Sequence, residues 1–449
     1  MGARTDAWGL PVTGDADAVA LWDAAVDDYL AFDGPDRVVA LVEQAPDLAV
    51  GHALLALAAM DGEAEADADV EIAQAERLAA DASEREHAFV AAMKESLGQP
   101  MWALDRVWGP YLADHPTDLL ARFTLMFAVL FAFREDGGAE AQRLVREGRR
   151  LNGAHPLVQS MLAMAAQERG ELDEAQAYAA EVLADRPGYI PAGHVTAHVH
   201  FERGDHQDGL AWLTRWVRDQ VRPGGPYLPH LSWHAGLHEL ALDDRAAVLR
   251  RLVELAGPDG DENWYLSNGA SYAWRLKLAG LVPAGEDPSG GLLGERAGAV
   301  AESPPFLFVG WHAALGLACA GDVPGLRAMA RRFEDATGDE VAPGGPEVLP
   351  PLAGALADLL EDRPGPAADA VARVTAHGKR LGGSRAQREV LEDTLLAALV
   401  RAGRTEQAGS LLQERLDRRP SASDSVRLAA LQLPLARSSP DPSATSLPG

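Results

Sequence analysis

Apolar residues recur along most of this chain with the spacing of helices. In the segments around 231–255, 306–333 and 386–401 they fall at positions i, i+3, i+4 and i+7. That stripe is the face by which an amphipathic helix packs on its neighbour. No comparable run of alternating Val, Ile and Thr occurs, so no sheet domain is expected. The pattern predicts an all-α protein.

Two segments carry the same turn signal 34 residues apart. Residues 168–175 read ERGELDEA and residues 202–209 read ERGDHQDG. A period of 34 is typical of tetratricopeptide repeats, in which a small residue, an Ala and a Pro recur at fixed places in each helix pair. Counted from Pro156, those places hold Ala163, Ala175 and Pro187. The spacing predicts a tetratricopeptide-like α-solenoid of stacked antiparallel helix pairs.

The same spacing of Gly, Ala and Pro recurs near the C-terminus. Composition indicates where the loops between helices lie. Gly403, Ala408 and Pro420 repeat the spacing of the signals at Gly170, Ala175 and Pro187. Segments 257–261, 283–305 and 341–346 are rich in Gly, Pro and acidic residues and are predicted to be loops, with a hinge at 283–305. We expect one helical repeat domain over 1–437 and a disordered tail over 438–449.

The net charge limits the classes of partner that this protein could bind, and its cysteine content indicates its cellular compartment. The 449 residues carry a formal net charge of −27, which repels phosphate backbones and anionic lipids, so no nucleic-acid partner is expected. A single cysteine, Cys319, fits a reducing compartment. No signal peptide and no apolar run of membrane-spanning length is recognisable. The sequence predicts a cytoplasmic protein without a membrane partner, and its alanine-rich, lysine-poor composition suggests a bacterial source.

Several short motifs occur together in a fixed order. They are HPTDLLA at 115–121, AHVH at 197–200, Trp233-His234, LGGS at 381–384 and AQR at 386–388. In this combination the chain resembles the tetratricopeptide repeat protein 38 family from about residue 7 to about residue 420. The resemblance implies a curved helical solenoid of poorly defined biochemical role. The chain departs from the family pattern where a His-Asp pair is Met126-Phe127, and where Asn268 and Gly310 each stand for an Asp.

Histidines are the most distinctive candidate chemistry. Nine of the 13 lie where the family resemblance places a histidine, at 52, 87, 115, 194, 198, 200, 230, 234 and 312. In this repeat class, positions 2, 5, 9 and 12 of the first helix of a pair face a concave groove. Those positions are His194 and His198 on one helix and His230 and Trp233 on the next, with His234 beside them. The pattern predicts that these side chains converge on one site.

Such a cluster suits several tasks. Imidazoles beside an indole can anchor an anionic or aromatic ligand, act in acid-base catalysis near pH 7, or hold a metal. Arg275 and Arg388 are predicted to add donors for a carboxylate or phosphate, and His312 is included in the predicted ligand-binding set. A metal is not favoured, because the sequence shows no nearby Cys, no confirmed carboxylate ligand and no complete H-E-x-x-H motif. No cofactor is predicted.

Three functional readings follow from the sequence. In the first, the concave groove of a binding module grips a peptide, a protein or a small molecule. In the second, an enzyme uses the groove histidines for hydrolysis, elimination or isomerisation of a small substrate. In the third, the histidines are buried groups that only hold helices together. An open groove would favour a peptide, and an enclosed pocket capped by residues 283–305 would favour a small substrate.

Overall fold

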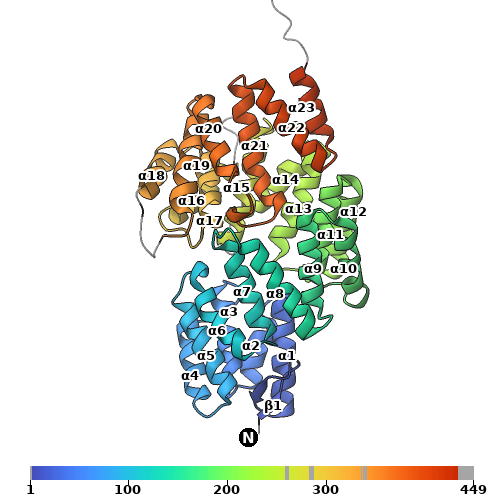
Figure 1. The fold of residues 1–449 in the computed structure, drawn as a ribbon, viewed down its shortest axis with the longest axis vertical. Coiled ribbons are helices and arrows are strands. Elements are labelled where there is room, and N and C mark those ends of the chain that lie inside the picture. The colour runs from blue at the N-terminus through green and yellow to red at the C-terminus, as the bar shows by residue number, and fades with distance from the viewer. Residues whose placement is uncertain (1–2, 258–261, 283–287, 335, 337–340, 433–449) are drawn as a thin grey trace, which may run out of the picture.

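The part of the chain that the structure describes is mostly helical (Figure 1). A computed structural model describes residues 3–257, 262–282, 288–334, 336 and 341–432. Within these residues lie 23 α-helices, so the predicted all-α class is confirmed. None of the described helices combines the length and the apolar character that crossing a membrane requires.

The first eight helices form the N-terminal part of the molecule, drawn in blue to cyan-green in Figure 1. They are α1 (Ala16–Leu30), α2 (Asp36–Gln44), α3 (Ala49–Met60), α4 (Ala68–Ala79), α5 (Glu84–Leu97), α6 (Asp105–Asp114), α7 (Leu119–Phe131) and α8 (Gly137–Asn152), with a short 3-10 helix at Met101–Ala103. A small antiparallel hairpin precedes them, in which β1 (Ala3–Thr5) pairs with β2 (Pro11–Thr13). Strands of three residues are too short to show an alternating pattern in sequence, which is why the hairpin was not predicted.

The middle and C-terminal helices continue the same up-and-down course. They are α9 (Pro156–Arg169), α10 (Leu172–Asp185), α11 (Ile190–Arg203), α12 (His206–Gln220), α13 (Leu228–Ala241), α14 (Arg245–Leu255), α15 (Glu262–Leu278), α16 (Pro288–Ala301), α17 (Leu307–Ala320), α18 (Val323–Glu334), α19 (Gly345–Leu360), α20 (Pro364–Thr375), α21 (Arg385–Arg401), α22 (Thr405–Arg418) and α23 (Ala422–Gln432). A second 3-10 helix, Gly378–Leu381, precedes α21.

The predicted 34-residue spacing is present in the middle of the chain. Helices α9 and α11 begin at Pro156 and Ile190, 34 residues apart. A short turn connects α9 to α10, and another connects α11 to α12. Both turns are made by glycines in the left-handed region, with φ of 85° at Gly170 and 75° at Gly204. Glycine adopts this conformation without the steric cost that a Cβ would add, so the repeated Gly ends each helix at the same place.

The helices at the centre of the chain are buried on nearly every side. Helix α11 contacts α9, α10, α12 and α13, and the first helices of successive pairs continue the row through α15, α17 and α19. Twelve of the 14 residues of α11 are buried. A helix enclosed in this way has little free polar face, and its residues His194 and His198 lie in the protein interior, whereas His200 is partly exposed.

The predicted loop at 283–305 is only partly a loop. Residues 288–301 form α16, so the prediction of a loop is wrong for that part of the segment. Pro288 stands at the first position of α16, where its missing N–H costs the helix nothing. Segment 341–346 leads into α19 at Gly345. Residues 283–287, most of the predicted loop at 257–261 and the predicted tail at 438–449 lie outside the described residues.

Candidate functional site

Four imidazole rings meet between α11 and α13. His194 and His198 lie one turn apart on α11, and His230 and His234 lie one turn apart on α13, so each helix contributes two rings from one face. The Nε2 atom of His194 is 3.0 Å from that of His198, 3.0 Å from that of His230 and 3.1 Å from that of His234. One nitrogen from each of the four residues lies within 4.8 Å of all the others. We call these four residues the four-histidine cluster.

The cluster is enclosed by protein. The four residues are at most 8% exposed, and His198 and His234 have no exposed surface. Burial lowers the pKa of His198 to about 3 and that of His230 to about 4, and the pKa values of His194 and His234 also lie well below 6.5. Burial is the largest cause because the charged imidazolium loses its hydration, and repulsion from neighbouring histidines adds to the shift for His194, His198 and His234. All four rings are therefore neutral near pH 7.

Neutral imidazoles cannot satisfy one another in this arrangement. Each ring has one N–H donor and one lone pair, so the single Nε2 atom of His194 can form one hydrogen bond with its three Nε2 neighbours. The Nδ1 atom of His230 lies 3.0 Å from Oδ1 of Asn268 and donates its proton there. The Nε2 atom of His230 is then a lone pair aimed at the cluster. A lone pair held in this position can bind a cation.

Second-layer contacts orient some of the rings. Besides the Asn268 contact, the hydroxyl of Tyr227 lies 3.3 Å from Nδ1 of His194. Trp233 stacks on His230, with ring centroids 5.4 Å apart and planes 12° from parallel. The Nδ1 atoms of His198 and His234 are buried and have no hydrogen-bond partner within the described residues. The cluster thus has a fixed tautomer at His230 and packed walls at Tyr227 and Trp233.

Five of the eight predicted site residues come together. They are the four cluster histidines and Trp233, which is fully buried. All five side chains are buried, so at these residues the predicted concave surface is not exposed to solvent. Tyr227 was not predicted, since it lies in the turn before α13 and no sequence motif marks it.

The other three predicted residues are engaged with protein groups outside the four-histidine cluster. Arg275 donates to Ser271 Oγ (2.6 Å), to the carbonyl of Ala386 (2.7 Å) and to Asp393 (3.2 Å). Arg388 pairs with Glu168 at 3.0 Å. These guanidinium groups are engaged within the protein, so the expected ligand-binding forks are structural contacts in this conformation.

His312 belongs to a different environment from the four-histidine cluster. It lies on α17, where its Nδ1 donates to the carbonyl of Phe308 at 2.8 Å and its ring stacks on Trp311 at 3.5 Å between centroids. Both contacts are of the kind that hold a buried histidine in a helical core. No protein-family model matches this chain.

Proposed function

We propose that this protein binds one transition-metal ion through His194, His198, His230 and His234. The observation that carries the proposal is the convergence of four buried Nε2 atoms, three of them 3.0–3.1 Å from the fourth. The proposal departs from the prediction of no metal made from sequence. That prediction looked for Cys and carboxylate ligands, whereas four imidazoles are by themselves a sufficient ligand set.

The three nitrogen–nitrogen distances at His194 fit a metal ion. Metal–imidazole bonds of about 2.0–2.1 Å, set at angles between 90° and the tetrahedral value, separate neighbouring nitrogens by about 2.8–3.4 Å. The contacts to His194 Nε2 fall within this interval. An organic ligand needs wider gaps between the groups that hold it, so a single ion suits the cluster better than a peptide or metabolite.

The donor set narrows the class of ion. Neutral imidazole suits zinc, copper, nickel and iron, while magnesium and calcium require oxygen ligands, which the cluster does not supply. Zinc is the first candidate because it accepts four nitrogen ligands without a strong geometric preference of its own. A site closed by four protein ligands favours a binding or structural role over catalysis, because catalytic zinc keeps a position open for water. The enzyme alternative is therefore the weaker one.

The setting of this site is also proposed. We infer a tetratricopeptide-like solenoid, supported by the 34-residue spacing of α9 and α11 and by the row of packed first helices. Membership of the tetratricopeptide repeat protein 38 family rests on the ordered motifs at 115–121, 197–200 and 381–388. A cytoplasmic location, where the single thiol stays reduced, is consistent with both.

Metal analysis tests the proposal. Purified protein is loaded with zinc, and excess zinc is removed by gel filtration. Elemental mass spectrometry is then expected to find one zinc ion per chain. The double variant His198→Ala, His234→Ala is expected to carry none, and His312→Asn serves as a control because it removes an equally buried histidine outside the cluster. Wild-type protein that retains no zinc, copper, nickel, cobalt or iron after loading would refute the metal site.

A further inference from the structure

A second pair of histidines lies between the four-histidine cluster and the surface. His206 is the first residue of α12, and His238 lies in the last turn of α13. Their Nδ1 atoms are 3.2 Å apart, and their ring centroids are 5.4 Å apart. His238 is fully buried, whereas His206 is partly exposed. The pair therefore reaches from the interior to the solvent.

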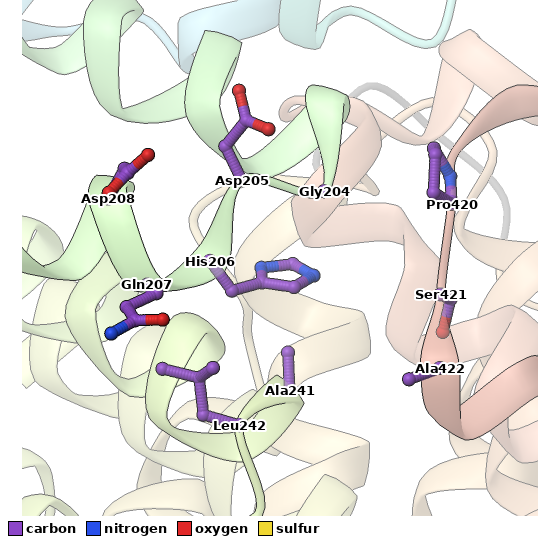
Figure 2. Close-up of a pocket in the computed structure, with 10 residues that line it drawn as sticks. All are labelled: Gly204, Asp205, His206, Gln207, Asp208, Ala241, Leu242, Pro420, Ser421 and Ala422. Atoms are coloured by element: carbon purple, nitrogen blue, oxygen red, sulfur yellow. The ribbon is translucent and has the colours of Figure 1, made fainter.

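The outer member of the pair faces a surface pocket of about 390 Å³. Figure 2 shows the ring of His206 pointing into the space between the α11–α12 turn and the segment that precedes α23. The lining residues include Asp205 and Asp208, both exposed, together with Leu242, Pro420 and Ser421. Two exposed carboxylates among the lining residues raise the local concentration of cations near the pocket.

The inner member of the pair leads toward the cluster. His238 follows His234 by one turn on the same face of α13. The Nε2 atom of His238 and the Nδ1 atom of His234 are buried and lack a hydrogen-bond partner within the described part of the chain. Helix α12 packs closely here, because a Cβ at Gly209 would lie 2.6 Å from Cε1 of His238. The imidazoles of residues 206, 238 and 234 thus follow one another from the pocket inward.

We infer that the pocket at His206 is the uptake port for the metal ion, and that His206 and His238 are transient ligands on its route to His234. The inference rests on the proposed metal-binding function. Asp205 and Asp208 gather the cation, and each histidine replaces part of its hydration shell before the next one binds. A route of this kind changes the rates of loading and release by the same factor and leaves the affinity unchanged.

Exchange kinetics test the route. Cobalt(II) uptake is followed by visible absorbance, and zinc release from the loaded protein is followed with the chelator 4-(2-pyridylazo)resorcinol. In His206→Asn, loading and release are expected to slow together by about tenfold or more, with one ion still bound per chain. His87→Asn is the matched control, because His87 is an exposed histidine on α5. The double variant Asp205→Asn, Asp208→Asn is expected to slow loading most at low salt.

Each outcome decides between the two proposals. If His206→Asn exchanges metal at the wild-type rate, the uptake route is refuted while metal binding stands. If His206→Asn loses the ion or binds it more weakly at equilibrium, His206 is part of the binding site and the route is again refuted. If the wild-type protein takes up neither cobalt nor zinc, the route falls together with the metal site itself.

Discussion

Two buried polar regions of this molecule are built on opposite principles. Among α21, α22 and α23, Arg415 donates to Glu389 at 3.0 Å, to Asp393 at 2.7 Å and to Asp424 at 2.8 Å. Between α11 and α13, four neutral histidines face one another. In the first region opposite charges satisfy each other within the protein, while in the second like groups meet and a cation is needed. Burial alone therefore does not mark a binding site; the convergence of several like groups on one point is the distinguishing feature.

The two regions are connected through α15. Arg275 pairs with Asp393 of the ion-pair region, and its guanidinium lies 5.7 Å from the ring of Trp233. Trp233 in turn stacks on His230. The pKa of Glu389 illustrates the balance, since burial raises it but Arg419 and Arg415 hold it well below its ordinary value. The ion-pair region thus reaches one wall of the cluster through Arg275 and Trp233.

The largest expected effect comes from breaking the self-satisfied region. Glu389→Ala removes the main carboxylate partner of the buried Arg419 and one of the three carboxylates around Arg415. We expect a loss of about 3–5 kcal/mol in the free energy of unfolding. Chemical denaturation measures it. Glu392→Ala is the matched control, because its pair with Arg418 is partly exposed and is expected to contribute at most about 1 kcal/mol. Similar losses in the two variants would contradict the comparison.

Removing the metal is expected to have the next largest effect. A ligand present at about a hundred times its dissociation constant stabilises the folded state by about 2.7 kcal/mol. Chelation should therefore lower the melting temperature of the loaded protein measured by calorimetry. The variant His234→Ala should melt at the same temperature with and without chelator. If the melting temperature of the wild-type protein does not change on chelation, the four-histidine cluster does not bind metal. Its role would then be structural, like that of the ion-pair region.

Asn268 tests the comparison further, because its uncharged amide orients the ring of His230, whereas charged groups fill the ion-pair region. Asn268→Leu removes the acceptor for His230 Nδ1 and is expected to weaken metal affinity by about 10–100-fold, or about 1.4–2.7 kcal/mol, as seen for second-layer partners. Isothermal titration measures the affinity. Asn268→Asp retains an acceptor and is expected to keep or strengthen binding. Equal weakening in both variants would mean that the contact does not position the ligand.

The smallest expected effect concerns a histidine with protein partners, His312. Burial lowers its pKa to about 3, so the unfolded chain binds a proton near pH 6.5 that the folded protein does not. The stability from this group is complete above pH 6.5 and declines as the pH falls toward 3. At pH 5.5 the loss is about 1.4 kcal/mol. Urea unfolding at pH 7.5 and 5.5 should show a smaller difference in His312→Gln than in wild type; an equal difference would contradict this.

Much of the fold was readable from sequence because it depends on local spacing. Gly170 and Gly204 end their helices because of their local conformation. The helical period of 3.6 residues places His194 and His198 on one face of α11, independent of the segment that packs against it. The pairing of α11 with α13 followed from the repeat period. The helix at 288–301 was missed, because Gly and Pro weaken a helical pattern that tertiary packing still stabilises.

The sequence by itself determined an all-α chain, the 34-residue spacing of α9 and α11, and two histidine pairs with helical spacing. Only the tertiary structure decided that the two pairs meet in the interior and that His312 lies outside the cluster. It also decided that Arg275 pairs with Asp393, 118 residues away, and that Arg388 pairs with Glu168, 220 residues away. The physical reason is range. Helix periodicity acts over a few residues, whereas burial and ion pairing depend on which distant segments share the same space.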